Sequence, residues 1–108
     1  MNFNDYQKAT EKTANYPKEN AIYYTGLGLV GEAGEVANKL KKIIRDDNGI
    51  ITEEKRKQLN YELGDVLWYI SQLATCLDLN LEQIAIDNIE KLKDRYSRNK
   101  INGDGDYR

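Results

Sequence analysis

The amino-acid sequence predicts an all-α protein, a four- to five-helix antiparallel bundle that is completed by oligomerisation. Apolar residues recur at the helical period through long segments, and capping residues and glycine-containing stops separate these segments. No segment shows the alternating pattern of a strand. The 108 residues fit one domain, residues 1–108, with a glycine-rich tail over about 100–108 that we expect to be flexible. Because a domain of this size buries a modest share of its surface, association with further copies would add stability.

The first two helices are expected over residues 5–15 and 19–45. Asn4 is a good N-cap for the first, and Gln7 is placed to complete a capping box. Pro17, the only proline, ends this helix or lies just beyond it. The second helix carries cations near its end, where the helix dipole favours them, and an Asp-Asp-Asn-Gly stop follows.

The last two helices are expected over residues 53–77 and 81–98. Thr52 caps the third helix, and Asn80 with Gln83 caps the fourth. The connections between the helices are short, so neighbouring helices should run antiparallel in a bundle.

Composition restricts the chemistry that this chain can perform. A net charge of −2 gives no broad cationic surface for a nucleic-acid polymer. The chain has no histidine, which removes the usual general base and the preferred ligand of zinc and copper. Any metal site must use carboxylates, and these favour Mg²⁺, with Mn²⁺ as an alternative. Cys76, the only cysteine, has no intrachain partner and is expected to pack inertly.

No segment is apolar enough to cross a membrane, and the N-terminus lacks the pattern of a secretory signal. We therefore expect a cytoplasmic protein without a membrane partner.

Four carboxylates lie where the helices should pack. On a helical wheel Glu32 and Glu35 follow one flank of the second helix's apolar stripe, Asp65 flanks the stripe of the third, and Glu62 falls inside it. A carboxylate in an apolar stripe needs compensation, and Glu62 could meet a lysine or arginine across the bundle. If the two helices face each other, their two acidic pairs repel unless cations lie between them, and divalent metal ions are the simplest choice.

The fourth helix carries a polar group and two cations beside its apolar stripe. Asn88 intrudes on that stripe, while Lys91 and Arg95 border it one turn apart, so that both cations can reach one polyphosphate. The alternative is an ordinary solvated face on which Asp87 pairs with Lys91. The wheel leaves both interpretations open.

These motifs resemble the MazG-like family of all-α nucleoside triphosphate pyrophosphohydrolases. The sequence has Gly-Glu-Ala-Gly-Glu at residues 31–35 and Glu-Leu-Gly-Asp at 62–65, with 26 residues between Glu35 and Glu62. Asn-Ile-Glu-Lys begins at residue 88, and the tail reads Gly-Asp-Gly-Asp-Tyr-Arg. The bare acidic pattern is weak evidence because charged helices produce it by chance, but in this context and order it is specific.

The resemblance implies Mg-dependent hydrolysis of a (deoxy)nucleoside triphosphate between its α and β phosphates, as nucleotide-pool house-cleaning. It assigns metal binding and catalysis to four carboxylates: Glu32, Glu35, Glu62 and Asp65. It places Asn88 and Lys91 near the substrate phosphates, with Arg95 as a weaker candidate. It also implies a homodimer or homotetramer.

Two aromatic residues are candidates for contacts with the base. Tyr69 lies close to Glu62 on the wheel, which makes it the better candidate. Trp68 points away from the main stripe, so it either walls the base pocket or packs at a subunit interface. Aromatic residues at helical spacing more often serve packing than stacking, and this interpretation also stays open.

Two other classes of protein use similar helices. A ferritin-like di-iron bundle needs Glu-x-x-His motifs, which a chain without histidine does not have. A non-catalytic helical adaptor or dimerisation module would explain amphipathic helices, but it gives no reason for Glu62 inside an apolar stripe.

Overall fold

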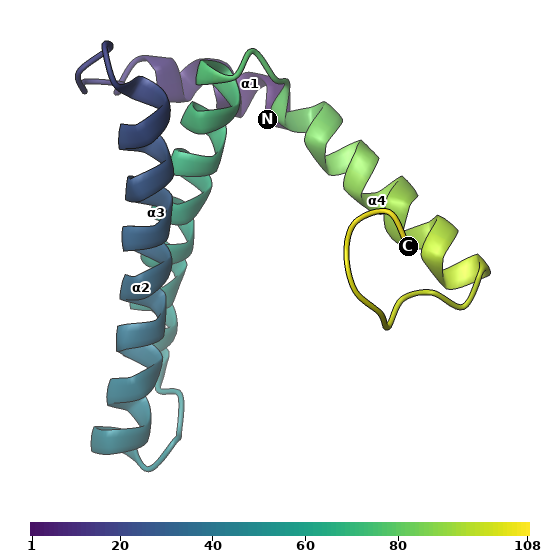
Figure 1. Cartoon of the computed structure of the whole chain (residues 1–108). Helices are drawn as coiled ribbons and strands as arrows, with labels where there is room; N and C mark the ends of the chain where they lie inside the picture. The colour runs from purple at the N-terminus through teal and green to yellow at the C-terminus, as the bar shows by residue number, and fades with distance from the viewer.

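The computed structural model describes residues 1–108 and confirms the all-α class. Its four helices are α1 (Phe3–Glu11), α2 (Ala21–Asp47), α3 (Glu53–Cys76) and α4 (Leu81–Ser97). The two long helices, α2 and α3, lie side by side and antiparallel (Figure 1). Between them Asn48 and Gly49 take positive φ values of 53° and 77°, as expected for the predicted stop.

The caps of α3 and α4 are those predicted from the sequence. The Thr52 side chain accepts a hydrogen bond from the backbone N–H of Lys55, and the Asn80 side chain accepts one from Gln83. Both helices also end within a residue of the predicted position. Strong N-caps therefore located these two helices from local chemistry alone.

The predicted start and end of α1 were wrong. Asn2, not Asn4, caps this helix and forms a capping box with Asp5, and the helix ends at Glu11 instead of residue 15. Gln7 is used in tertiary contacts instead: its amide donates to the Thr75 hydroxyl and accepts from the backbone of Leu81. Competition between local capping and tertiary hydrogen bonds decided the boundary.

Hydrogen bonds between buried polar side chains hold α1 against α3. Thr10, Ser71 and Gln72 are each at most 3% exposed. The Gln72 amide donates to the Thr10 hydroxyl at 2.9 Å, and the Thr10 and Ser71 hydroxyls lie 3.1 Å apart. The Tyr16 hydroxyl, in the segment after α1, donates to Gln72 at 2.6 Å. Because these groups satisfy one another, their burial does not carry the cost of unpaired polar groups.

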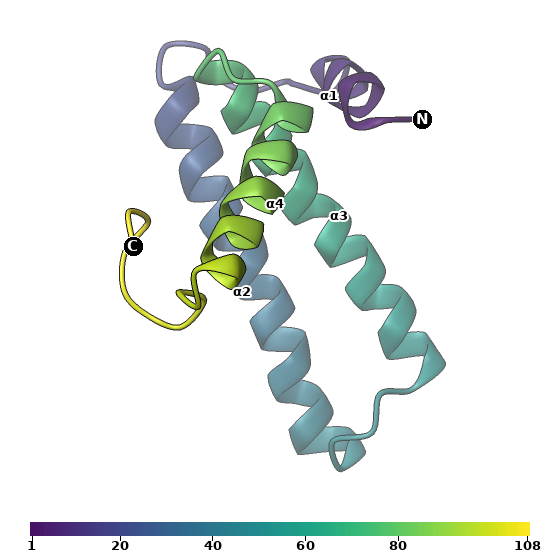
Figure 2. The ribbon, with the colours of Figure 1, turned by 90° about the vertical axis from the view of Figure 1, so that its right-hand side faces the viewer.

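Helix α4 leaves the other helices and projects away from the α2–α3 hairpin (Figure 1), so that it passes in front of the hairpin when the molecule is turned by 90° (Figure 2). It contacts α1 and α3 but not α2. Leu81 at its start is 4% exposed, whereas Ile84, Ile86 and Ile89 farther along are exposed. One chain therefore does not close the bundle around α4. None of the four helices is long and apolar enough to cross a membrane.

Candidate functional site

The facing sides of α2 and α3 bring together polar residues that the sequence singled out. On α2, residues at helical spacing share one face: Tyr24, Gly28, Glu32, Glu35 and Lys39. Because α3 runs antiparallel, its residues Tyr69, Asp65 and Glu62 run alongside them in that order. This pairing of faces confirms that the two acidic motifs meet.

Three of the four predicted carboxylates converge between the two helices. Each of Glu32, Glu62 and Asp65 offers an oxygen atom, and these oxygens all lie within 4.8 Å of one another. The oxygen ligands of one Mg²⁺ lie about 2.1 Å from the ion, and therefore about 3–4 Å from each other. The limit of 4.8 Å lies somewhat above this range, so binding of a hard divalent cation by this all-oxygen donor set would draw the three side chains slightly closer together.

The like charges affect Glu32 most clearly. Burial raises the pKa of its carboxyl group, and the neighbouring carboxylates of Asp65, Glu62 and Glu35 raise this pKa further. Glu35 itself is exposed and lies outside the three converging groups, so it borders the cluster without joining it. Positive charge among these groups would relieve the repulsion.

Lys39 supplies one such charge, and it was not among the predicted site residues. Its Nζ lies 3.8 Å from Oε1 of Glu62, with side chains 29% and 19% exposed. No other cation is within ion-pair distance of the four carboxylates. The ion pair proposed as an alternative for Glu62 is therefore present beside the converging carboxylates. Lys39 lies one helical turn beyond Glu35 on the same face, a sequence signal that was attributed to the helix dipole.

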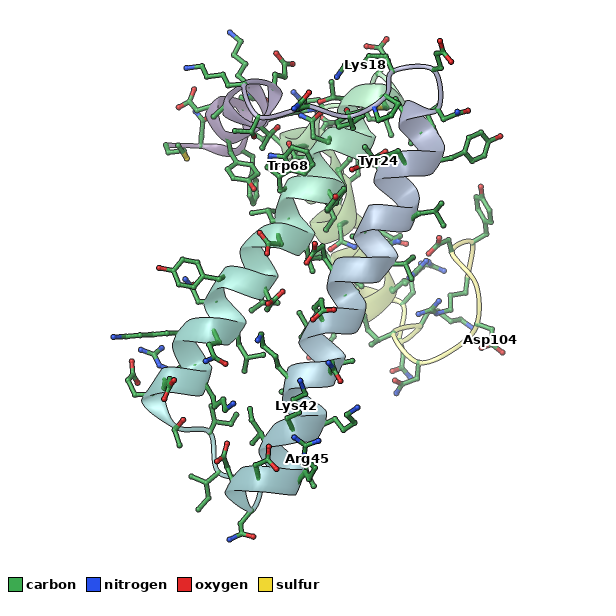
Figure 3. All side chains as sticks on the ribbon, turned by 90° about the vertical axis from the view of Figure 1, so that its left-hand side faces the viewer. Lys18, Tyr24, Lys42, Arg45, Trp68 and Asp104 are labelled. Carbon is green, nitrogen blue, oxygen red and sulfur yellow. The ribbon has the colours of Figure 1, made fainter.

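Aromatic residues gather at the end of α2 and α3 nearer α1, where Figure 3 labels Tyr24 and Trp68, and we call Tyr16, Tyr24, Trp68 and Tyr69 the aromatic cluster. Tyr16 stacks on Tyr24 with ring centroids 5.3 Å apart. Trp68 meets Tyr16 and Tyr69 edge to face, at 6.3 and 5.0 Å. The Trp68 ring N–H donates to the Thr13 hydroxyl. Both predicted aromatic contacts therefore belong to one packed cluster.

The aromatic cluster adjoins the carboxylates through Tyr69. Burial raises the pKa of its hydroxyl, and Tyr24, Glu32 and Asp65 raise this pKa further, which places all three groups nearby. The Tyr69 ring lies against the backbone of Gly28: a Cβ atom there would come within 2.1 Å of its Cε1. Only glycine leaves room for this ring. Neither Gly28 nor Tyr16 was among the site residues predicted from the sequence.

The predicted phosphate contacts on α4 are not brought to the carboxylates of the same chain. Asn88 is exposed, and α4 makes no contact with α2. Lys91 lies 3.1 Å from the Asp106 carboxylate. Arg95, 4% exposed, donates to the backbone oxygen of Asp106 at 2.6 Å. Both cations therefore hold the C-terminal tail against α4.

Comparisons with known proteins bear on the family of the chain. A family model described as the MazG nucleotide pyrophosphohydrolase domain matches residues 23–98, which contain the four carboxylates and Lys39. The Gene 37 protein of Mycobacterium phage L5 is 47% identical over 114 aligned residues that span 100% of both chains. No solved structure matches the chain. Since the family match covers more than half of the sequence, this protein belongs to the MazG nucleotide pyrophosphohydrolase family.

Proposed function

We propose that this protein hydrolyses a (deoxy)nucleoside triphosphate between its α and β phosphates, in a reaction that depends on Mg²⁺. The products are a nucleoside monophosphate and pyrophosphate. The observation that carries the proposal is the convergence of Glu32, Glu62 and Asp65, with oxygens within 4.8 Å of one another, in a chain of this family.

The three converging carboxylates would hold the metal ion, and Glu35 at the rim would complete the set directly or through water. Mg²⁺, or Mn²⁺ in its place, supplies charge that polarises the α-phosphoryl group and lowers the pKa of a bound water. We assign to Glu35 the role of accepting the proton from the attacking water, because it is exposed and lies outside the three converging carboxylates. The new bond joins the water oxygen to the α-phosphorus, and the bond to the oxygen that bridges the α and β phosphates breaks.

The base would lie beside the aromatic cluster, where Tyr69 and Trp68 are the predicted contacts. Asn88, Lys91 and Arg95 do not reach the carboxylates of their own chain. We propose that they contact nucleotide only if another subunit's α4 covers the carboxylates.

We propose a homodimer or homotetramer on the basis of exposed surface. The chain exposes 8166 Å², whereas a compact monomer of 12.5 kDa would expose about 6,200 Å². Its radius of gyration is 16.7 Å, against about 13 Å for a compact chain of this length. A standard interface covers about 800 Å² on each partner, and permanent ones cover more, so the excess matches a permanent assembly.

The proposed role is cleaning of the cytoplasmic nucleotide pool. The decisive experiment measures pyrophosphate and monophosphate released from a panel of canonical and modified nucleoside triphosphates, with Mg²⁺ and with chelator. Glu62→Gln should abolish release, whereas Glu54→Gln, an exposed residue of the first turn of α3, should leave it unchanged. Undiminished turnover in Glu62→Gln would reject the metal assignment.

The extensive exposed apolar surface also suits a non-catalytic adaptor or dimerisation module. Thermal unfolding separates the two functions. A cation that binds only the folded state raises the melting temperature. Mg²⁺ should therefore raise the melting temperature of the enzyme and leave that of an adaptor unchanged.

A further inference from the structure

Three chemical classes of side chain follow one another along the α2–α3 pair. The aromatic cluster lies at the end nearer α1, the carboxylates come next, and Lys39 lies beyond them. On α2 the order is Tyr24, Glu32, Lys39, and with a rise of about 1.5 Å per residue each step covers roughly 10–12 Å. This row of side chains therefore has a direction.

A nucleoside triphosphate also has a direction, with a flat base at one end and the greatest negative charge at the other. When the α phosphate lies at the carboxylates, the β and γ phosphates point toward either the aromatic cluster or Lys39. Bases stack on aromatic rings, whereas terminal phosphates need cationic partners. The reverse orientation would place the most highly charged phosphates among phenol and indole rings.

We propose that the nucleotide lies with its base toward the aromatic cluster and its β and γ phosphates against Lys39, which binds the leaving pyrophosphate. This inference rests on the proposed function and adds a substrate-binding residue to it. The separation of 3.8 Å between Lys39 Nζ and Glu62 Oε1 is too long for a hydrogen bond, so the ammonium group keeps its donors free for phosphate oxygens. Its side chain is 29% exposed and can be reached from solvent.

The cations of α4 do not take this role within one chain. Lys91 and Arg95 are both engaged by Asp106, and α4 projects away from α2 and α3 (Figure 1). Lys39 is the one cation that the fold itself brings to the carboxylates. It follows that Lys39 distinguishes ligands by the length of the phosphate chain: a triphosphate reaches it and a monophosphate does not.

The test compares Lys39→Met with Lys42→Met. Lys42 is a matched control because it is also partly buried, lies about one turn farther along the same side of α2, and makes no ion pair with the carboxylates. Calorimetry with Mg²⁺ measures binding of two ligands: the α,β-imido analogue of the best triphosphate substrate and the corresponding monophosphate. We expect Lys39→Met to weaken binding of the analogue about 10-fold or more, with monophosphate binding within about 2-fold of wild type.

Two further measurements separate ligand binding from support of the fold. Lys39→Arg keeps the charge and should retain most of the affinity for the analogue, even if Lys39→Met unfolds. Without nucleotide, Lys39→Met should bind Mg²⁺ more tightly than wild type, because a competing positive charge beside Glu62 is gone.

If Lys39→Met lost equal affinity for both ligands, the inference would be overturned, since Lys39 would then only hold Glu62 in place. The inference would also be overturned if Lys42→Met lost as much affinity for the analogue as Lys39→Met, because that would indicate a diffuse electrostatic effect. If wild type releases pyrophosphate while Lys39→Met behaves as Lys42→Met, only the orientation fails. If wild type binds neither ligand, the proposed function fails with it.

Discussion

At the scale of single residues, the contact between Gly28 and Tyr69 connects packing with the site. Gly28→Ala places a Cβ atom about where the Tyr69 ring now lies. We expect the ring to shift, with a loss of roughly 1–3 kcal/mol in the free energy of unfolding and a lower rate of hydrolysis. Denaturant unfolding and pyrophosphate release measure the two effects.

Gly26→Ala is the control for this substitution, because a Cβ atom at Gly26 meets nothing within 4 Å. Alanine favours helix over glycine by about 0.5–1 kcal/mol, so Gly26→Ala should stabilise the protein. Equal stability of the two variants would show that the Tyr69 ring adapts without cost.

Glu32 illustrates a conflict between stability and metal binding. Burial first, and then three neighbouring carboxylates, raise its pKa, so its charged form is disfavoured in the metal-free fold. Glu32→Gln should therefore raise the melting temperature in chelator by roughly 1–4 °C, and remove the further rise that Mg²⁺ gives to wild type. Differential scanning calorimetry tests both effects. A variant that Mg²⁺ still stabilises as much as wild type would exclude Glu32 as a ligand.

Glu62 could be singled out from the sequence for a physical reason, because a charge inside an apolar stripe must be compensated. Glu32, Glu35 and Asp65 only flank the stripes, and their assignment came from the resemblance of the motifs to the family. Lys39 was not recognised, because its place on the wheel fits a helix-end cation equally well. Gly28 was missed because the need for glycine arises from the Tyr69 ring, which approaches from another helix.

At the scale of elements, Asp106 is the contact that holds the tail on α4. Hydrogen bonds from Lys91 and then Arg95 lower its pKa, so the contribution is present above the ordinary pKa of an aspartate and is lost as pH falls through the lowered value. Asp106→Asn should increase fast backbone motion of residues 103–107 at neutral pH, measured by heteronuclear NMR relaxation.

Asp104→Asn is the control in the same tail, since no ion pair involves Asp104. Wild type should show the same gain in motion only when the pH falls below about 4, the ordinary value for an aspartate, and through the lowered pKa of Asp106. A tail equally ordered in Asp106→Asn would mean that the hydrogen bonds of Arg95 and Arg108 to backbone oxygens suffice.

The helices themselves were more predictable than their ends. Thr52 and Asn80 act as local caps, which need no information about distant residues. At α1 two asparagines compete, and the outcome depends on Gln7 bonding to Thr75 and to the start of α4. That preference arises only from the folded arrangement.

At the scale of the whole molecule, the direction of α4 departs from a closed single-chain bundle. Short connections favour antiparallel neighbours, but Asp78 takes a left-handed conformation with φ of 57° before α4 begins, and α4 projects outward. Its apolar residues Ile84, Ile86 and Ile89 stay exposed. Rules for bundles assume that one chain buries its own apolar faces, so they do not predict where α4 lies when the chain leaves these faces exposed.

The last prediction concerns that assembly. On α2 the side opposite α3 carries an exposed apolar stripe. Within one chain, α3 is the only helix that α2 contacts. The large residues of this stripe are Tyr23, Leu27, Val30 and Ile44. Val30→Glu places a charge in its middle, where the side chain is 69% exposed, and glutamate suits a helix better than valine. The variant should therefore weaken association without weakening the helix.

Sedimentation equilibrium should give a dimer or tetramer for wild type and a shift toward monomer for Val30→Glu. The melting temperature of wild type should rise with protein concentration, and that of Val30→Glu should be lower and less dependent on concentration. Ile50→Glu, at a residue 66% exposed in the loop between α2 and α3, is the control and should assemble as wild type does. If wild type were a monomer with full turnover, the proposed assembly would be rejected. The exposed stripe and the outward α4 would then have no partner in the active protein.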